Sequence, residues 1–454
     1  MAKIKSKYIC QNCGYESTGY LGRCPDCGTW SSFVEEVSDR DKNFTSINLP
    51  DNTPPMPLSE IEMNSEIRVS TSIKEFDRVL GGGIVQGSLI LLAGDPGIGK
   101  STILLQTSGE LCKINKKVLY ISAEESASQI KLRAERLGIQ SNNLYIYPQT
   151  SFELIKKHVE EMKPDLVIID SIQAIYTSTI QSSSGSVSQI RECCNSLMTI
   201  AKTNNISIIV IGHVTKEGNI AGPKVLEHMV DTVIQFEGDK YKTYRILRSI
   251  KNRFGNTSEV GIFEMSSKGL TEILNPSELF LKEYNQTQTP GSTIIVTSEG
   301  SRPLLVEIQA LIGTTPYPSP RRVANGVDVS RVLQILAVLE KRIGLNLSKQ
   351  DVYVNVIGGI DVSEPAADLG IALAIITCVR DVVFDSHTAI IGEIGLSGEI
   401  RAVNHIDKRI VEAKKLGFKR VIIPEANELQ EKIDNIEIIR VKRIIEAITR
   451  SISK

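Results

Sequence analysis

The sequence predicts an α/β protein whose main domain contains a mostly parallel sheet. Three observations support this prediction. From about residue 67 to 275, short and continuous apolar runs alternate with helical segments, a pattern typical of parallel strands covered by helices on both faces. A cluster of four cysteines precedes this region, and a second region of alternating strands and helices follows from about residue 290. We therefore expect a small N-terminal module and two α/β domains.

Changes in composition set the expected domain boundaries. Residues 1–36 form the cysteine-rich module, residues 37–66 a polar, proline-containing linker, residues 67–275 the first α/β domain and residues 276–454 the second. A chain of 454 residues suits about three domains. The expected strands of the first domain are SLILLAG, KVLYISAE, NLYIYP, DLVIID and ISIIVIG, and those of the second are STIIVTSE, PLLVEIQALI, DVYVNVIGG and TAIIGEIGL. The second domain also has helical patterns at residues 330–343 and 406–416.

Composition excludes several classes of protein. The net charge is −1, so any contact with nucleic acid must come from local basic loops and not from the overall charge. The apolar runs are too short to span a membrane. The basic first ten residues are not followed by the apolar stretch of a secretory signal. We expect a cytoplasmic protein without a membrane partner.

The four clustered cysteines have the spacing of a metal site. Cys10, Cys13, Cys24 and Cys27 read C-x2-C-x10-C-x2-C, and two such pairs of thiolates suit tetrahedral Zn²⁺. Glycines 14 and 28 follow the second cysteine of each pair, where a tight turn needs backbone freedom. Four sulfur ligands complete the coordination shell, so the predicted zinc is structural. Two disulfides or a redox pair are the alternatives, which a reducing compartment disfavours.

A phosphate-binding loop lies between an expected strand and an expected helix. Residues 94–101, GDPGIGKS, match G-x4-G-K-[ST]. In this context backbone N–H groups and the helix N-terminus face the phosphates of ATP. Lys100 should reach the β- and γ-phosphates, and Ser101 should bind Mg²⁺. The alternative is a plain glycine turn. The predicted nucleotide-binding residues are Gly94, Asp95, Pro96, Gly97, Ile98, Gly99, Lys100, Ser101 and Thr102.

Polar side chains end three further strands. Asp170 ends the run LVIID and is a candidate partner for the magnesium ion. Glu124 and Glu125 follow the run YISA, where a carboxylate can orient or deprotonate the attacking water, and we place Glu124 first. Solvated loop charges are the alternative for this pair. His213 ends ISIIVIG and is either a sensor of the γ-phosphate or a polar loop residue.

These motifs together resemble a known family. The phosphate loop, SAEES, LVIID and IGHVTKEGNIAGP resemble the RecA-like ATPase core, and the pentapeptide KNRFG at residues 251–255 resembles the signature of the RadA/Sms family of bacterial DNA repair proteins. The cysteine module, core, pentapeptide and C-terminal region follow in the same order. The resemblance implies a DNA-dependent, helicase-like ATPase that acts on recombination intermediates, promotes branch migration with the RecA recombinase and forms a homo-hexamer. Single-stranded and branched DNA are its implied partners.

The pentapeptide supplies two candidate catalytic cations. Lys251 and Arg253 flank an asparagine and could reach a neighbouring subunit's ATP, where they would stabilise transition-state charge. A basic surface turn and a contact with DNA phosphates are the alternatives. The resemblance also implies that two polar loops, residues 177–188 and 216–224, line a DNA channel. Their composition alone indicates only flexible loops.

The C-terminal region resembles the proteolytic domain of Lon, in GGIDVSEPAADLGIALAI and GEIRAVNHIDKRIVEAKKLGFKRVIIPEAN. Lon cleaves with a serine–lysine dyad. Ala366 stands at the serine position here and Asp407 at the lysine position, so acyl-enzyme chemistry lacks its nucleophile. We expect a scaffold without peptidase activity. Lys408, Arg409, Lys414 and Lys415 could form a basic stripe facing DNA, or a solvated helix face.

Two functions therefore remain open beside the disfavoured protease. The first is a ring-shaped ATP-driven DNA translocase. The second is an ATP-gated recombination mediator that binds DNA and recombinase without translocating. Both use the same motifs, so the residues do not separate them.

Overall fold

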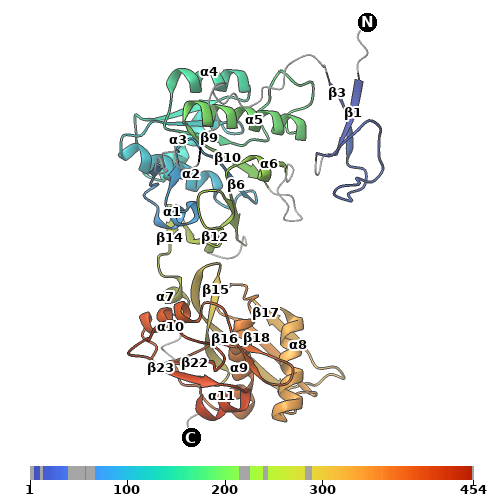
Figure 1. Cartoon of the computed structure of the whole chain (residues 1–454), viewed down its shortest axis with the longest axis vertical. Coiled ribbons are helices and arrows are strands. Elements are labelled where there is room, and N and C mark those ends of the chain that lie inside the picture. Colours follow the sequence, from blue (N-terminus) through green and yellow to red (C-terminus); the bar gives the residue numbers. More distant parts are fainter. Residues whose placement is uncertain are drawn as a thin grey trace. The chain divides into compact units, whose positions relative to one another are not determined.

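The computed structural model describes residues 5–10, 14–38, 57, 67–213, 225–238, 244–281, 289–358 and 360–451. The chain divides into two compact units, Met1–Leu274 and Asn275–Lys454 (Figure 1). Most of the predicted linker, the predicted loop at residues 216–224 and Cys13 lie outside the described residues. In the described parts of the chain, no helix combines the length and apolar character needed to cross a membrane.

The cysteine-rich module contains a small antiparallel sheet in the order β2-β1-β3. Its strands are β1 (Lys5–Cys10), β2 (Glu16–Ser17) and β3 (Phe33–Ser38). Cys10, Cys24 and Phe33 form the buried centre of this module. Such a small core leaves little apolar area to stabilise the fold, which is typical of modules that depend on a metal.

The first unit contains a nine-stranded sheet in the order β14-β13-β12-β11-β6-β10-β9-β7-β8. The strands from β11 to β8 are parallel, and β12, β13 and β14 extend the sheet in antiparallel fashion. The strand bounds are β6 (Leu89–Gly94), β7 (Val118–Ser122), β8 (Leu144–Pro148), β9 (Leu166–Asp170), β10 (Ser207–His213), β11 (Thr232–Glu237), β12 (Tyr244–Asn252), β13 (Val260–Ser266) and β14 (Gly269–Glu272). All five strands predicted for this domain are confirmed.

Helices cover both faces of this sheet. Their bounds are α1 (Lys74–Leu80), α2 (Lys100–Lys113), α3 (Ala127–Arg136), α4 (Phe152–Met162), α5 (Val187–Asn204) and α6 (Val225–Met229). Along β6, Leu89 and Leu91 pack into one core with α4 and α5, while Ile90 and Leu92 pack into the other with α1, α2 and α3 (Figure 1). Successive strand side chains point to opposite faces, so a central strand buried on both sides must be apolar at every position. A short hairpin of β4 (Arg68–Val69) and β5 (Ile84–Val85) flanks α1.

The second unit is built on a seven-stranded mixed sheet in the order β17-β18-β16-β15-β19-β22-β23. Its strands are β15 (Ser292–Glu299), β16 (Arg302–Thr314), β17 (Arg322–Asn325), β18 (Gln350–Val356), β19 (Thr388–Ile390), β22 (Arg420–Pro424) and β23 (Glu437–Val441), with a separate pair β20 (Glu393–Ile394) and β21 (Ile400–Arg401). Its helices are α7 (Pro276–Phe280), α8 (Val329–Val338), α9 (Asp368–Arg380), α10 (Ile406–Lys415) and α11 (Ile444–Ser451). A π-helical turn, η3 (Leu339–Ile343), continues α8, and a 3-10 turn, η4 (Pro365–Ala367), precedes α9.

The predicted α/β fold class is confirmed, with one local difference. The run TAIIGEIGL was expected to form a single strand, but it divides between β19 and β20, which belong to different sheets. The chain leaves the large sheet at Gly392, whose N–H donates to the carbonyl of Ala366. Ile391 still bonds to β22 of the large sheet, whereas Gly392 bonds to η4. A continuous apolar run in the sequence does not show where the backbone changes its hydrogen-bond partner.

Candidate functional site

The phosphate loop joins the end of β6 to the start of α2, as its motif predicts. Gly99 occupies the N-cap of α2 with φ 121°, a backbone conformation that residues with a side chain rarely adopt. A Cβ at Gly99 would also lie 2.8 Å from Cε of Met265. The backbone conformation therefore favours glycine here, and a larger residue would also displace the end of the Met265 side chain.

Lys100 lies within this loop and is almost fully buried, with 4% of its surface exposed. Its Nζ donates hydrogen bonds to the carbonyls of Gly94 at 2.7 Å and Asp95 at 2.9 Å. Burial lowers the pKa of Lys100 to about 8, although the nearby carboxylates of Asp170, Asp95 and Glu124 act in the opposite direction. An ammonium group that is poorly solvated in this way gains strongly from a phosphate placed beside it.

Asp170 ends β9, and its carboxylate accepts a hydrogen bond of 2.6 Å from the hydroxyl of Tyr120 on β7. Burial and the adjacent Asp170 raise the pKa of Tyr120, so the phenol stays a hydrogen-bond donor. One carboxylate oxygen is thereby held in place at the carboxyl end of the sheet. Asp170 and the hydroxyl of Ser101 are hard oxygen donors of the kind that Mg²⁺ prefers.

Glu124 lies in a chain of polar contacts that begins at the phosphate loop. Nζ of Lys100 lies 3.3 Å from Nδ1 of His213, and Nε2 of the same ring lies 3.4 Å from Oε1 of Glu124. The hydroxyl of Ser171 donates to the same oxygen of Glu124. His213 thus bridges the loop lysine and the candidate catalytic carboxylate, and it is not an isolated loop residue.

Glu125 has different surroundings from Glu124. Its carboxylate forms an ion pair of 2.6 Å with Arg133 on α3, and its backbone carbonyl accepts from the hydroxyl of Ser122. Because the carboxylate of Glu125 is paired with Arg133 on α3, the geometry favours Glu124 as the carboxylate that faces the phosphate loop.

The KNRFG motif lies at the opposite end of the sheet from the phosphate loop of the same chain. Asn252 pairs with Thr232, which in turn pairs with Ile90 near the start of β6, whereas the phosphate loop begins where β6 ends at Gly94. Ile90 and Gly94 are four residues apart along β6, which corresponds to roughly 13 Å along the strand. The motif therefore does not reach the nucleotide site of its own chain.

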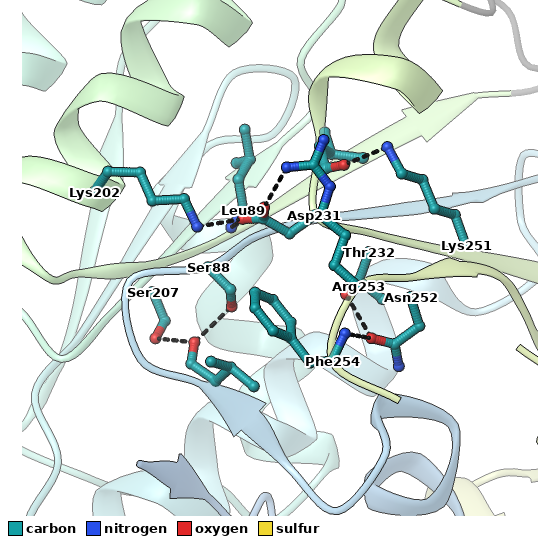
Figure 2. A network of polar contacts seen from close by, with 12 residues as sticks. Ser88, Leu89, Lys202, Ser207, Asp231, Thr232, Lys251, Asn252, Arg253 and Phe254 are labelled. Atoms are coloured by element: carbon teal, nitrogen blue, oxygen red, sulfur yellow. Dashed lines mark hydrogen bonds and ion pairs between the residues drawn. The ribbon is translucent and has the colours of Figure 1, made fainter. Parts of the chain in front are cut away.

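Both cations of the motif have contacts within the chain, which Figure 2 shows. Nζ of Lys251 donates to backbone carbonyls at the end of α6, those of Glu227 (2.8 Å), His228 (3.2 Å) and Val230 (2.9 Å). Arg253 pairs with Asp231 at 3.4 Å while 55% of its side chain stays exposed. Lys251 therefore caps a helix, and Arg253 remains accessible to another molecule.

The first predicted DNA loop, residues 177–188, forms hydrogen bonds with the side chains of Glu153 and Gln189. Glu153 accepts from the hydroxyl of Thr177 and from the backbone N–H and hydroxyl of Ser178, all within 3.0 Å. Burial would raise the pKa of Glu153, but these hydrogen bonds outweigh it and lower the pKa to about 2. The buried amide of Gln189 donates to the carbonyls of Thr177, Ile180 and Ser182. Polar composition suggested a flexible loop, and the contacts instead describe an organised one.

Three of the four predicted metal ligands lie together. The sulfur atoms of Cys10, Cys24 and Cys27 are all within 4.8 Å of one another, and those of Cys10 and Cys27 are 3.7 Å apart. A disulfide needs about 2.05 Å, whereas two thiolates on tetrahedral zinc are roughly 3.8 Å apart for Zn–S distances of about 2.3 Å. The sulfur geometry therefore fits zinc and not a disulfide between these residues.

The two cysteine pairs have matching turns. Gly14 N–H donates to the carbonyl of Cys10 at 2.8 Å, and Gly28 N–H donates to that of Cys24 at 3.0 Å. Both glycines have positive φ, 77° and 73°, as the sequence predicts. Cys13 lies outside the described residues, so its place as the fourth ligand stays a prediction.

In the second unit, the two positions aligned with the Lon dyad by sequence both have contacts within the domain. Ala366 is 2% exposed and packs in the core with Ile294 and Leu305. Oδ1 of Asp407 accepts from the backbone N–H of Gln430 at 3.1 Å. The prediction of a basic stripe was wrong in one member, since the guanidinium of Arg409 is buried and pairs with Glu364.

Curated relatives match this chain over its whole length. A protein named DNA repair protein RadA from Bacillus subtilis is 53% identical and covers 100% of both chains. A protein of the same name from Listeria monocytogenes is 50% identical over 100% of both chains, and one from Streptococcus pyogenes is 53% identical over 95% of this chain and 94% of its own. This chain belongs to the RadA family of DNA repair proteins.

Family models agree with the domain types of this RadA-family chain. The AAA domain matches residues 55–219, the rubredoxin metal binding domain matches residues 8–35, and the ChlI subunit of Mg-chelatase matches residues 327–427. The protein thus has an ATPase domain of the AAA type, a metal-binding ribbon and a C-terminal domain similar to ChlI and Lon. The solved structure of a KaiC-like protein from Pyrococcus horikoshii covers 46% of this chain and 99% of its own, at 20% identity and a TM-score of 0.40.

Some residues of this RadA-family site were missed by sequence reasoning. The hydroxyl of Tyr120 is the one polar group in the run VLYI, and a phenol in a buried strand usually has a partner. That signal could have identified it. Asp231 and Lys202, which contact the KNRFG motif, carry no local signal because their partners in the motif, Arg253 and Phe254, lie 22 and 52 residues further along the chain.

Proposed function

We propose that this RadA-family protein is a DNA-dependent ATPase that works as a ring, translocates on DNA and promotes branch migration with the RecA recombinase at recombination intermediates. The observation that carries the proposal is the placement of the KNRFG motif and the phosphate loop at opposite ends of one sheet. A chain with this arrangement can complete a neighbour's nucleotide site but not its own. Repetition of such a head-to-tail contact generates a ring where the rotation closes and an open filament where it does not. We propose the closed form, a homo-hexamer.

Within one subunit, residues at the carboxyl end of the sheet bind and orient ATP. Lys100 pairs with the β- and γ-phosphates, and the loop residues 94–102 surround them with backbone N–H groups. Ser101 and Asp170 would hold Mg²⁺, which supplies neutralising charge to the phosphates when bound. Glu124, held by Ser171 and His213, orients the attacking water and accepts its proton.

The neighbouring subunit supplies the remaining charge. Arg253 is half exposed and lies at the end of the sheet opposite its own phosphate loop, so it is the residue suited to reach the γ-phosphate across an interface. Lys251 is committed to the carbonyls at the end of α6 and acts by holding the motif. Helix α6 follows directly after residues 214–224, so Lys251 also anchors the chain beside the second predicted DNA loop.

The central test is DNA-stimulated ATP hydrolysis. Wild-type protein should hydrolyse ATP faster with single-stranded DNA, and Lys100→Ala should abolish the stimulated rate. Arg253→Ala should lower kcat roughly a hundredfold or more, and Arg253→Ala chains should impair wild-type neighbours in mixed rings. If wild-type chains keep their full rate in the mixture, Arg253 does not act in trans and the proposal of a shared site is wrong.

A forked DNA substrate separates the translocase from the mediator. ATP-dependent displacement of the annealed strand supports a translocase. Stimulation of RecA strand exchange without unwinding in either polarity would instead identify an ATP-gated mediator. Particle images with a nucleotide analogue and single-stranded DNA would count the subunits of the ring and locate the loop at residues 177–188.

We also propose that the C-terminal domain is a scaffold without peptidase activity. The position that carries the nucleophile in Lon is a buried alanine here, and the lysine position holds Asp407. The zinc module is proposed to bind one structural Zn²⁺ through Cys10, Cys13, Cys24 and Cys27.

A further inference from the structure

The carboxylate of Asp231 connects the KNRFG motif to the rest of the ATPase domain. Its side chain is 2% exposed. Oδ2 accepts from Nζ of Lys202 at 2.8 Å and from the backbone N–H of Leu89 at 3.0 Å, and Oδ1 accepts from Arg253 at 3.4 Å. Figure 2 shows Lys202 and Arg253 reaching this carboxylate from different sides. One buried group therefore joins α5, the start of β6 and the motif.

Electrostatics explain why these groups stay together. A carboxylate buried without partners would be costly, and here two cations and one N–H satisfy its charge. The side chains of the two cations remain partly exposed, 39% for Lys202 and 55% for Arg253. Asp231 is therefore the group of the three that loses most of its hydration. Lys202 also lies 5.7 Å from the ring centroid of Phe254, within the range of a cation–π contact.

The backbone of the motif is held by other contacts. Phe254 N–H donates to the side chain of Asn252 at 3.0 Å, and the carbonyl of Phe254 accepts from Arg68 at 2.6 Å. These contacts set the path of the chain. They do not set the direction of the Arg253 guanidinium, which the carboxylate of Asp231 contacts directly.

We propose that Asp231 and Lys202 are positioning residues that orient Arg253 for its action on a neighbouring subunit's ATP. This inference rests on the proposed trans role of Arg253. Asp231 holds the guanidinium near its working direction, and Lys202 balances the charge of Asp231 and packs on Phe254. Without Lys202, Asp231 would pair more tightly with Arg253 and draw it back from the interface. Without the charge of Asp231, Arg253 would sample many directions.

Lys202→Met and Asp231→Asn test the proposal in the full-length protein. Each should lower kcat for single-stranded-DNA-stimulated ATP hydrolysis roughly tenfold, because small misplacements of a catalytic group cost one to two orders of magnitude in rate. KM for ATP should change by less than about twofold, because the chain's own phosphate loop is intact. Lys202→Arg keeps the charge and the reach to Asp231, and it should restore the wild-type kcat.

A matched pair elsewhere in the same domain serves as control. Asp165 accepts from Nζ of Lys116 at 2.9 Å and from the backbone N–H of Lys117 at 2.8 Å. It therefore shares the lysine and backbone donors of Asp231, but it has no arginine partner, does not contact the motif and is 41% exposed. Lys116→Met and Asp165→Asn should leave kcat unchanged. Asp231→Asn changes a buried group and could reduce folding. Lys202→Met alters a partly exposed side chain and keeps the test decisive in that case.

Mixing identifies the subunit in which the defect acts. A Lys100→Ala chain cannot hydrolyse ATP but carries an intact Arg253. Added to Lys202→Met chains, it should raise the turnover per Lys202→Met chain, because it supplies a correctly oriented arginine to that chain's ATP. Damage to the Lys202→Met chain's own nucleotide site would not be relieved in this way.

The outcomes distinguish this inference from the function on which it rests. If Arg253→Ala itself leaves turnover unchanged, the trans role fails and the positioning role with it. If Arg253→Ala loses turnover and is rescued by Lys100→Ala chains while Lys202→Met behaves like Lys116→Met, only the positioning role is wrong. A fall in thermal stability of Lys202→Met without a change in kcat would likewise overturn it.

Discussion

Nδ1 of His213 lies 3.3 Å from Nζ of Lys100, at the point where β10 and β6 run side by side and end. The same ring contacts Glu124 through its other nitrogen. The lysine of the phosphate loop is nearly buried, and the loss of hydration on burial lowers its pKa to about 8. This relationship makes nucleotide binding sensitive to pH.

The first prediction is that ATP binding takes up protons through Lys100 near pH 8. In the free protein about half of the Lys100 side chains are charged at pH 8. Bound phosphates favour the charged form and raise the pKa, so affinity is fully present below pH 8 and weakens as pH rises above it, by up to about tenfold per pH unit. Calorimetric titration with ATP in two buffers of different ionisation enthalpy measures the uptake directly.

Lys100→Arg is the control for this measurement. A guanidinium remains charged throughout this pH range, so the variant should bind ATP without proton uptake between pH 8 and 9. Equal uptake by wild-type and Lys100→Arg proteins would assign the effect to another group.

The second prediction concerns the cysteine module. Cys10→Ser should lower bound zinc from about one per chain to well below that, because removal of one of four thiolates leaves an incomplete tetrahedral shell. Elemental analysis and a chromogenic chelator provide the measurement. Cys112 is buried away from this cluster, so Cys112→Ser should retain full zinc. Full occupancy in Cys10→Ser would contradict the four-ligand site.

The third prediction is that Gln189 organises the first predicted DNA loop. Its side chain is 1% exposed and makes hydrogen bonds to the N–H and carbonyl of Thr177 and to two further carbonyls. Gln189→Leu leaves these groups without their partner and should cost about 2–3 kcal/mol locally. Hydrogen exchange at residues 177–182 should then become much faster, with a weaker response of ATP hydrolysis to single-stranded DNA.

Gln106 provides a matched amide for comparison. Its side-chain amide donates to the carbonyl of Leu270 on β14 and accepts from the N–H of the same residue, away from the loop. Gln106→Leu should therefore lower stability without exposing residues 177–182 to exchange. Unchanged protection of the loop in Gln189→Leu would show that Glu153 alone maintains it.

How much of this molecule the sequence predicts depends on how local each feature is. The strand–loop–helix context of the phosphate loop was predicted correctly because its motif lies within eight consecutive residues. The positions of Glu124 and Asp170 near Lys100 could be predicted because polar residues at the carboxyl ends of parallel strands lie at the same end of the sheet. The placement of KNRFG at the other edge depends on the antiparallel register of β11 and β12, which no local pattern specifies.

Features that depend on distant partners were missed or misread. The loop at residues 177–188 is polar and rich in serine, and only the tertiary contacts of Glu153 and Gln189 show that it is organised. Arg409 has the spacing of a basic helix face, yet its guanidinium turns inward to Glu364 and to the carbonyl of Val296 at 2.7 Å. A charged residue on an amphipathic helix is usually exposed, so its inward partner must be known before its burial can be inferred.

The fourth prediction is that Arg409 stabilises the C-terminal unit. Arg409→Met would leave Glu364 and the carbonyls of Val296 and Asn404 without their shared donor, and should lower the free energy of unfolding of this unit by about 3 kcal/mol. Hydrogen exchange of peptides from residues 289–451 at increasing urea concentrations measures the loss. Lys408 is exposed on the same helix, so Lys408→Met should have no such effect. Equal stability of both variants would show that the pair is not structural.

The fifth prediction is that Ala366→Ser does not create a peptidase. The new hydroxyl would lie in a core of apolar side chains, where no substrate carbonyl can approach it. The lysine position holds Asp407, whose carboxylate already accepts a backbone hydrogen bond, so no neutral amine is available to take the serine proton. Cleavage of fluorescent casein with ATP should stay at the background level for Ala366→Ser and for the double variant Ala366→Ser/Asp407→Lys. ATP-dependent cleavage by Ala366→Ser that is absent from the wild-type protein would show that this position is accessible and that the domain retains peptidase geometry.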